Sequence, residues 1–374
     1  MSPSLFVGTA IAFLACMEIH QLLPLLNYGD AIGNHAMGIQ QTLRRWGHSS
    51  EIFAEGCHEK VEHLYHHYSE HSATASPDSL LIYHHCIGGT EAFEYFRAAR
   101  CRKTLIYHNI TPSHYFADFH PELHQQTKTG RRELLMLRDV VQKAIGVSEY
   151  NCQELRDVGF VDPLVLPISI DVEAFGARTA DENLLQFFDD GYTNILFVGR
   201  LCPNKRQDLL IRAFDRYRRT KNAKSRLFLV GSYQGMERYC NHLLDAMRQI
   251  EACNIIISGH VNNAELATYY RLADVFVCLS EHEGFCVPLL ESMYCDVPIV
   301  AYDSSGVTST LGGASVLLES HDEQTVVDAI DRMVTHGALR AEIVKQQRAR
   351  LADFAPQVIE PVLQRCLKEI VAYA

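Results

Sequence analysis

Residues 195–230 read ILFVGRLCPNKRQDLLIRAFDRYRRTKNAKSRLFLV. The apolar run Ile195–Val198 predicts a buried strand, the apolar spacing within Gln207–Arg219 predicts a helix, and Leu227–Val230 predicts a second strand. Strands that alternate with helices in this way build a parallel sheet with helices on both faces. This stretch therefore indicates an α/β domain.

The same alternation continues on both sides of these residues. Later strands are expected at Ile255–Ser258, Val275–Leu279, Ile299–Tyr302 and Ser315–Leu318, and earlier ones at Ile19–Leu26, Glu51–Ala54, Ser79–Ile87, Thr104–Ile110, Ala144–Ser148 and Leu164–Pro167. Helical patterns separate them, at Gly38–Gly47, Thr90–Arg100, Arg131–Val141, Asn151–Val158, Glu237–Ile250, Ala264–Leu272, Val287–Tyr294 and Glu323–Thr335. The chain is therefore predicted to form two tandem Rossmann-like, doubly wound domains that face each other across a cleft.

The alternation pauses at residues 171–192, where Asp, Glu, Gly and Asn accumulate. We expect a linker there, between an N-terminal domain at 1–170 and a C-terminal domain at 193–355. Residues 356–374 read as a terminal helix that adds to no sheet of its own. This helix is expected to pack back on the N-terminal domain.

An apolar run from Leu5 to Met17 precedes the first strand. A signal peptide or a membrane anchor is one interpretation, but no basic region precedes the run, and a spanning helix needs ~20 apolar residues. We favour another interpretation, in which Met17 is the true start and residues 1–16 are an upstream extension, because a strand begins directly after Met17.

The composition is that of a folded globular protein. Of 374 residues, 47% are hydrophobic and 21% are charged, and the net charge of −11 argues against a nucleic-acid partner. Twelve cysteines are scattered without regular spacing, which indicates reduced thiols and a cytoplasmic protein. Histidines crowd one stretch, but their spacing does not favour a metal site, and we expect neither a metal nor a cofactor. The crowded histidines are His58, His63, His66, His67, His71, His84 and His85.

Ligands of doubly wound domains bind outside the carboxyl ends of the strands, so function is sought in the loops there. Arg200 and Lys205 flank the turn after the strand Ile195–Val198, and two cations in such a place suit a pyrophosphate. Ten Lys or Arg residues fall between Arg200 and Arg226. Most of these should form a solvated helix face, although some could contact anionic lipid at the inner face of a membrane.

The most specific pattern is EHEGFCVPLLE at residues 281–291. Gly284 permits an unusual turn, and the amides of Phe285 and Cys286 lie where a helix begins, so a phosphate could be held there. Glu283 and Glu291 would lie roughly 10 Å apart along this helix. Because carboxylates accept hydrogen bonds from hydroxyls, each glutamate suits one end of a nucleotide sugar.

Two loops of the first domain are weaker candidates. Gly29 and Gly33 follow the first strand and lead into a helix, which could let a diphosphate approach the backbone, although the G-x-G-x-x-G pattern is absent. A plain strand-to-helix turn explains them equally well. His108 and Asn109 end the strand Thr104–Ile110, where they could reach a polar ligand or simply satisfy loop carbonyls.

Several motifs together resemble the retaining GT-B glycosyltransferases of the large family 4, the glycosyl transferases group 1. They follow one another in the family's order over roughly Ile19 to Leu318, most clearly in the second domain. The motifs are FVGRLxPxK at 197–205, GHVxxxEL at 259–266, ADVFV at 273–277, EGFxxPLLE at 283–291 and the glycine-bearing loop at 303–313.

The resemblance implies that Glu283 contacts the donor sugar, Glu291 the ribose, and Arg200 and Lys205 the diphosphate. His108 is similar in position to the family's active-site histidine, so His108 and Glu283 are the expected catalytic residues. The other expected donor-binding residues are Gly29, Gly33, Gly284, Phe285 and Cys286. Two departures stand out, since the family usually has glycine where this chain has Cys286 and Asp296.

The expected function is metal-independent transfer of a hexosyl unit, with retention, from GDP-mannose or a UDP-hexose to a saccharide or lipid-linked acceptor hydroxyl. Departure of the diphosphate would be stabilised by Arg200, Lys205 and a helix N-terminus. Two other functions stay open. A nucleotide-sugar 2-epimerase shares this architecture, and a nucleotide-sugar-binding protein that has lost turnover would fit the unusual Cys286.

Overall fold

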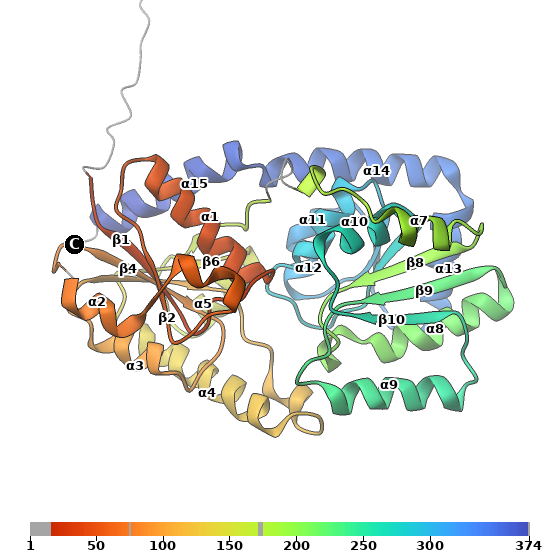
Figure 1. Ribbon diagram of the computed structural model, residues 1–374, viewed down its shortest axis with the longest axis horizontal. Coiled ribbons are helices and arrows are strands. Elements are labelled where there is room, and N and C mark those ends of the chain that lie inside the picture. Colours follow the sequence, from red (N-terminus) through yellow and green to blue (C-terminus); the bar gives the residue numbers. More distant parts are fainter. Residues whose placement is uncertain (1–15, 75, 171–174, 373–374) are drawn as a thin grey trace, which may run out of the picture.

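The computed structural model describes residues 16–74, 76–170 and 175–372. The expectations for residues 1–16 therefore lie almost wholly outside the described residues, as do the first residues of the expected linker. Figure 1 shows two α/β domains side by side, with a strand-bearing core in each. Each of the twelve strands predicted from the sequence is present in these domains.

The N-terminal domain holds a parallel sheet of seven strands in the order β3-β2-β1-β4-β5-β6-β7. Its strands are β1 (Ile19–Leu23), β2 (Ile52–Ala54), β3 (Tyr65–His67), β4 (Leu80–His85), β5 (Arg102–Tyr107), β6 (Lys143–Gly146) and β7 (Leu164–Val165). The edge strand β3 was not predicted, because its residues are polar and only half-buried.

Helices cover both faces of this sheet. They are α1 (Ala31–Arg45), α2 (Tyr68–Thr74), α3 (Glu91–Ala98), α4 (Pro121–Leu137) and α5 (Glu149–Asp157), with short 3₁₀ segments η1 (Glu59–Leu64) and η2 (Ser113–Phe116). Side chains cap several helix starts: Asp30 accepts from the Gly33 amide, and Ser148 accepts from the Asn151 amide.

The C-terminal domain holds a second parallel sheet, of six strands in the order β10-β9-β8-β11-β12-β13. The strands are β8 (Thr193–Val198), β9 (Ser225–Val230), β10 (Ile255–Gly259), β11 (Val275–Cys278), β12 (Ile299–Tyr302) and β13 (Val316–Leu318). Two parallel sheets, each covered by helices, confirm the prediction of two Rossmann-like domains.

The helices after residue 180 surround this second sheet and close the chain. They are α7 (Glu182–Phe188), α8 (Gln207–Thr220), α9 (Glu237–Gln249), α10 (Asn263–Leu272), α11 (Val287–Tyr294), α12 (Ser305–Leu311), α13 (Glu323–Thr335), α14 (Gly337–Leu351) and α15 (Pro356–Ala372), with η3 (Pro203–Lys205) and η4 (Ala352–Phe354). The helix α7 lies within the expected linker, and the amide of Asp181 before it donates to Thr268 of α10.

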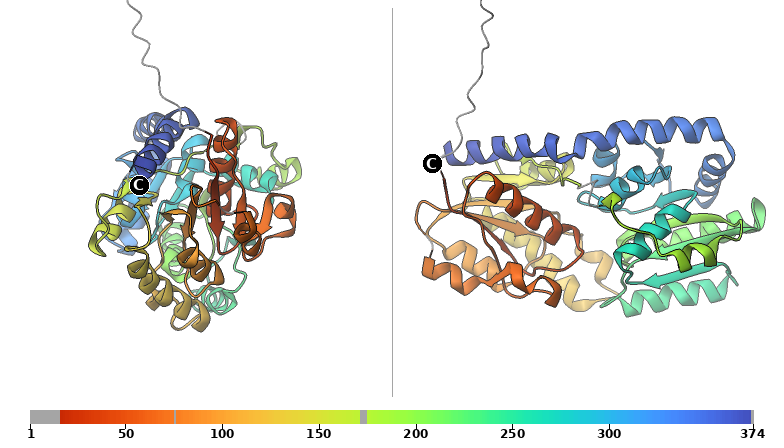
Figure 2. Two further views of the ribbon diagram at one scale, coloured as in Figure 1. Left: turned by 90° about the vertical axis from the view of Figure 1, so that its left-hand side faces the viewer. Right: turned by 45° about the horizontal axis from the view of Figure 1, so that its top comes forward.

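The last helix lies over the first domain rather than the second. Figure 2 shows α14 along the C-terminal domain and α15 continuing across to the N-terminal one. Arg45 of α1 pairs with Glu360 of α15 at 2.7 Å, and apolar α15 residues such as Leu363 and Leu367 join the core that contains Ile39 and Leu43. The chain therefore crosses between the domains twice, which limits how far they can separate.

Candidate active site

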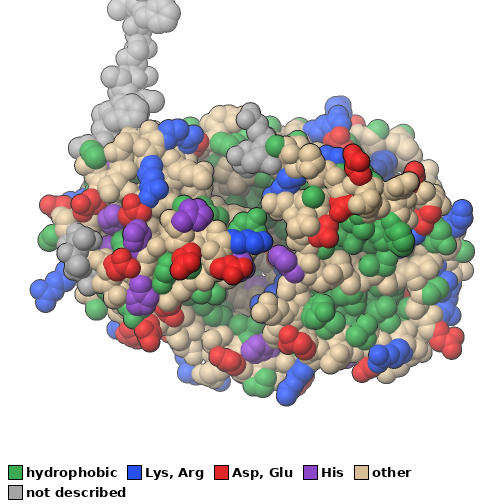
Figure 3. All heavy atoms as spheres, viewed as in Figure 1, with side chains coloured by type: hydrophobic (Ala, Val, Ile, Leu, Met, Phe, Trp, Pro, Cys, Tyr) green, Lys and Arg blue, Asp and Glu red, His purple; other side chains and the backbone are tan. Residues whose placement is uncertain are grey.

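The site lies where the carboxyl ends of the two sheets meet. A space-filling view shows the surface hollowed between the domains, with histidine, basic and acidic side chains gathered around the hollow (Figure 3). On the C-terminal side, the loops after β8 and β11 supply Lys205 and Glu283. On the N-terminal side, the loop after β5 supplies His108.

Lys205 and Glu283 form an ion pair, although they are 78 residues apart in the sequence. Burial alone would lower the pKa of Lys205, but the charge of Glu283 outweighs it and raises that pKa above its usual value. Lys205 is therefore a permanent cation. The Asn204 amide group donates to the His282 carbonyl at 2.9 Å, which ties the two loops together and fixes the pair.

Arg200, by contrast, is exposed, and its Nη2 donates to the Gln234 carbonyl at 3.0 Å. The residue leaves the end of β8 and reaches the loop that follows β9, close to Gly235 and His120. The structure thus brings Lys205 and Glu283 together, while Arg200 stands at the rim of the site as a cation that is open to solvent.

The turn at Gly284 is a close contact between the two domains. A Cβ atom at Gly284 would lie 2.4 Å from the carbonyl oxygen of His108 and 2.9 Å from the Cβ of Asn109. The Ser148 hydroxyl donates to the Gly284 carbonyl at 2.7 Å. Only a residue without a side chain fits here, so Gly284 acts through close backbone approach.

His282 and Asn109 add a second contact between the domains. The Nδ2 group of Asn109 donates to Asn151 and Glu154, at 2.9 and 2.8 Å, so its Oδ1 accepts from His282 Nε2 at 2.7 Å. Burial, together with the charges of Arg131 and Lys205, lowers the pKa of His282 to about 3, so the ring is neutral. The side-chain oxygen of Asn109 is therefore used in this contact between the domains.

Cys286 begins α11 with a left-handed backbone, at φ +75°. Asp296, the other departure from the resembled family, also has positive φ, at +57°. Glycine adopts such conformations more readily than other residues, which explains why glycine would be usual at both positions. Asp296 is held by a bidentate contact with Arg348.

Phe285 contributes only its backbone to this region. Its side chain is buried against Phe354, with ring centroids 5.5 Å apart, and its carbonyl accepts from Thr310 at 2.6 Å. The amide of Glu283 donates to the Ser305 hydroxyl at 2.8 Å, and the amide of Gly306 donates to the Glu283 carbonyl at 2.9 Å. Hydrogen bonds from the start of α12 therefore hold the backbone of the turn in place.

Glu291 lies just over one turn into α11 and is largely buried. The Tyr270 hydroxyl donates to its Oε2 at 2.9 Å, and Arg178 Nη1 lies 3.9 Å from its Oε1. Burial raises the pKa of this carboxyl group above its usual value. Glu291 is thus held by Tyr270 and Arg178, in the middle of the short helix.

The loop after β1 lies on the opposite side of the site. Gly29 has positive φ, at +79°, with free space around it, whereas Gly33 lies in the first turn of α1, where a Cβ would be 2.4 Å from the Asn27 carbonyl oxygen. Two residues further along α1, the His35 ring lies 5.5 Å from the His108 ring, centroid to centroid. This loop and His108 therefore face the same region.

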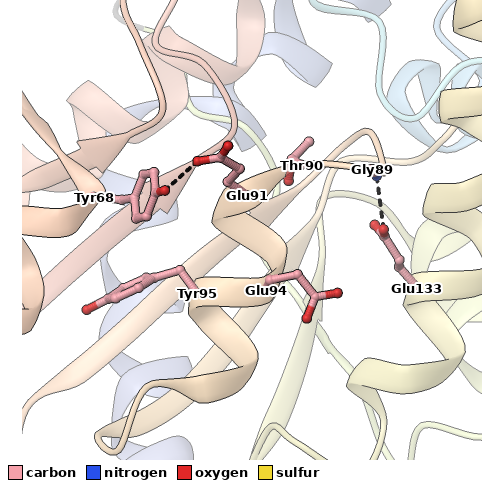
Figure 4. Close-up of a pocket in the computed structure, with 7 residues that line it drawn as sticks. All are labelled: Tyr68, Gly89, Thr90, Glu91, Glu94, Tyr95 and Glu133. Atoms are coloured by element: carbon pink, nitrogen blue, oxygen red, sulfur yellow. Dashed lines mark hydrogen bonds between the residues drawn. The ribbon is translucent and has the colours of Figure 1, made fainter.

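A shallow pocket of about 560 Å³ lies on the N-terminal domain, where α3 begins. Figure 4 shows Glu94 of α3 and Glu133 of α4 on one side of the helix, and Glu91 with Tyr68 on the other. Glu133 Oε1 accepts from the Gly89 amide at 2.9 Å, and burial raises the pKa of this carboxyl group. The pocket is thus lined by carboxylates and tyrosine rings.

The basic run between Arg200 and Arg226 is mostly paired within the protein. Among the residues that the structure describes, seven of its ten cations form ion pairs, namely Lys205, Arg206, Arg212, Arg218, Arg219, Lys221 and Arg226. No helix among the described residues is long and apolar enough to cross a membrane.

Some residues at the site had no distinctive signal in the sequence. Ser148, Ser305, Asn204 and Gln21 each form a hydrogen bond at the site with a partner at least 22 residues away in the sequence. Only the fold brings these partners together. A serine that caps a helix, such as Ser148, could have been recognised as a cap but not as a contact between the domains.

Two Rossmann-like domains that meet at the carboxyl ends of their sheets define the GT-B arrangement. Solved structures share it over nearly the whole chain. Anabaena Alr3699/HepE in complex with UDP-glucose matches with a TM-score of 0.77 and 16% identity, over 94% of this chain and 99% of that one. Sucrose-phosphate synthase from Thermosynechococcus elongatus matches with a TM-score of 0.74 and 16% identity, over 96% and 100%.

The family model for "Glycosyl transferases group 1" matches residues 186–350. A D-inositol 3-phosphate glycosyltransferase of Streptosporangium roseum is 29% identical over 58% of this chain and 52% of its own length. A GDP-mannose-dependent alpha-mannosyltransferase of Mycolicibacterium smegmatis is 31% identical over 37% of this chain and 33% of its own. The chain spans about half the length, or less, of the curated relatives it matches. Its C-terminal half belongs to the glycosyl transferases group 1, as the motifs predicted.

Proposed function

We propose that this protein is a retaining glycosyltransferase that moves a hexosyl unit from a nucleotide diphosphate sugar, GDP-mannose or a UDP-hexose, to an acceptor hydroxyl. The observation that carries this proposal is the pair formed by Lys205 and Glu283 at the turn that begins α11, directly opposite the backbone of His108. The names of the matched relatives and the UDP-glucose complex of a structural neighbour support a nucleotide-sugar donor.

The charges of the site suit a departing diphosphate. Lys205 is a permanent cation, Arg200 is exposed at the rim, and the N-terminal end of α11, where the helix dipole is positive, lies at the turn. These groups would stabilise the negative charge that develops on the diphosphate as the glycosidic bond breaks. Because they already neutralise that charge, we propose that the reaction needs no metal.

Two glutamates would hold the ends of the donor. Glu283, beside Lys205, would accept hydrogen bonds from sugar hydroxyls, and the buried Glu291 from the ribose. The diphosphate would then lie along α11 between them. We propose that the departing phosphate assists the incoming hydroxyl on the same face of the sugar, which keeps the anomeric configuration.

We place the acceptor, a saccharide or a glycolipid, on the N-terminal domain. The pocket beside α3 offers three carboxylates to hydroxyl groups, from Glu91, Glu94 and Glu133. Arg97 is the cation that pairs with Glu94 there, at 3.2 Å. An acceptor rich in hydroxyl groups suits this lining better than an anionic one. A Glu94→Gln variant should raise the KM for the acceptor and leave the KM for the donor unchanged.

A cytoplasmic location and peripheral contact with a membrane belong to the same proposal. All twelve cysteines are free thiols, as expected in a reducing compartment. Among the described residues, Arg216 and Lys224 are the cations of the basic run that form no ion pair and take no part in the site, and these two would contact anionic lipid. Flotation with anionic and neutral vesicles tests this contact, and equal flotation with both would contradict it.

The direct test is release of nucleoside diphosphate from UDP-glucose, UDP-galactose and GDP-mannose, with and without a panel of saccharide and glycolipid acceptors. We expect release that depends on an acceptor, persists in EDTA and falls at least tenfold in Lys205→Met and Glu283→Gln. Isomerised donor without acceptor would identify an epimerase instead. Donor binding without turnover on any acceptor would identify a binding protein.

A further inference from the structure

Three polar side chains form a continuous chain of hydrogen bonds from the core of the N-terminal domain to the site. Gln21 lies on β1 and His84 on β4, and both are fully buried. His84 Nε2 lies 2.9 Å from Gln21 Oε1, and His84 Nδ1 lies 2.9 Å from Nε2 of His108. His108 follows β5 and is partly exposed.

The direction of each hydrogen bond can be deduced from the first one. Gln21 Nε2 donates to the Ala36 carbonyl at 2.9 Å, so the amide oxygen of Gln21 faces His84. An oxygen accepts only, and therefore His84 carries its proton on Nε2. Burial and the neighbouring His35 lower the pKa of His84 well below its usual value, so the ring is neutral and its Nδ1 is a bare acceptor.

The proton of the second bond must then come from His108. Because His84 Nδ1 has only a lone pair to offer, Nε2 of His108 carries the hydrogen and donates it. Burial, with the charges that His84, His35 and His85 would carry, also lowers the pKa of His108 well below its usual value. In this neutral ring Nδ1 keeps the free lone pair, and within the described residues Nδ1 has no hydrogen-bond partner and is not sealed from solvent.

We propose that Gln21 and His84 are positioning residues that fix the tautomer of His108, with the proton on Nε2 and an acceptor at Nδ1. What His108 then binds rests on the proposed function. An acceptor nitrogen can bind a hydroxyl group of a sugar, whereas it repels the oxygen atoms of a phosphate. His108 would therefore contact the sugar or the acceptor hydroxyl, and Lys205 the diphosphate.

A metal site is the competing interpretation of these histidines, since nitrogen atoms of His35, His84 and His108 lie within 4.8 Å of one another. A metal would need a lone pair from both members of the His84 and His108 pair. The planes of the His84 and His108 rings differ by 21°, the ring centroids are 5.1 Å apart, and the two facing nitrogen atoms are 2.9 Å apart. The two nitrogens thus point at each other, as a shared proton requires.

The test is nitrogen NMR of the full chain labelled with ¹⁵N-histidine, which reports which ring nitrogen carries the proton. We expect the Nε2–H tautomer for His108 in the wild type and a mixture of tautomers in His84→Phe and Gln21→Leu. In these variants kcat should fall roughly tenfold to a hundredfold, while the donor KM stays within about twofold. The matched control is His85→Phe, the next residue of β4, which is equally buried but bonds to the Gly130 carbonyl instead.

Several results would overturn the inference. These are an Nδ1–H tautomer for His108 in the wild type, an unchanged tautomer in His84→Phe, or a fall in kcat for His85→Phe as large as for His84→Phe. Micromolar Zn²⁺ that shifts the signals of all three histidines would favour the metal site and also contradict it. Addition of UDP-glucose or GDP-mannose should shift the Nδ1 signal, and UDP or GDP alone should not. If no nucleotide sugar binds the wild type, the proposed function fails, but the tautomer still decides whether His84 positions His108.

Discussion

A methyl group at Gly284 should disturb the contact between the two domains. A Cβ there would lie 2.4 Å from the His108 carbonyl oxygen, where real Cβ atoms stay beyond 3.0 Å, so the gap must widen by at least 0.6 Å. The His108 backbone cannot easily yield, because its amide donates to the His85 carbonyl at 3.1 Å and three hydrogen bonds fix the next side chain, Asn109.

The cost of such overpacking is about 1–3 kcal/mol. If the donor binds to the domain arrangement seen here, Gly284→Ala should weaken donor affinity by roughly 5-fold to 150-fold, since about 1.4 kcal/mol corresponds to a factor of ten. Isothermal titration calorimetry with UDP-glucose and GDP-mannose measures the affinity, and urea unfolding measures the stability.

The matched control is Gly38→Ala in α1, where a Cβ meets no atom within 4 Å. Because alanine is the better helix residue, this variant should be about 0.5–1 kcal/mol more stable and should bind donor normally. Wild-type affinity and turnover in Gly284→Ala would refute the claim that the two domains meet at this turn in the active protein.

Three further predictions concern charge, backbone strain and pH. Lys205→Met should weaken nucleotide-sugar binding by about 1.5–3 kcal/mol, because it removes a charge-assisted hydrogen bond. The control Arg212→Met, on the exposed side of α8, should bind the nucleotide sugar normally. Equal losses of affinity in calorimetry would contradict the assignment of Lys205 to the diphosphate. Cys286→Gly should raise the free energy of unfolding by up to about 1 kcal/mol in urea titration, since it relieves a left-handed backbone; a lower value would show that the thiol contributes more than the strain costs. Burial lowers the pKa of several histidines, to about 4 for His20, His35, His71 and His85 and to about 3 for His282. Below pH 6.5 the unfolded chain therefore binds more protons than the folded one, and each of these histidines should lower the free energy of unfolding by about 1.4 kcal/mol per pH unit as the pH falls from 6.5 toward 4. A urea midpoint unchanged between pH 7 and pH 5 would contradict this.

The strands could be predicted from the sequence because buried parallel strands are continuous apolar runs. The edge strand β3 was missed because Tyr65, His66 and His67 have no such run. The start of α4 was placed ten residues late, although Pro121 is a common first residue of a helix. The short helix α12 was missed because Ser305, Gly306 and Thr308 are weak helix formers and only the packing against Glu283 supports them.

The candidate site could be predicted in part. The residue types after β8 and β11 pointed to Lys205 and Glu283, and the structure places them in contact, although their roles stay predictions. The chain from Gln21 to His108 could not be predicted, because a buried glutamine and a buried histidine have no spacing in the sequence that links them. The need for glycine at position 284 could not be predicted either, because the backbone that leaves no room for a side chain there belongs to His108, in the other domain.

The central claim is that Lys205 and the start of α11 hold a diphosphate. The most direct measurement is calorimetry of UDP against UMP, and of GDP against GMP, with the wild type and Lys205→Met. We expect one diphosphate to bind the wild type at least tenfold more tightly than its monophosphate, and Lys205→Met to lose most of this difference. Equal affinities for the diphosphates and monophosphates in the wild type would contradict it.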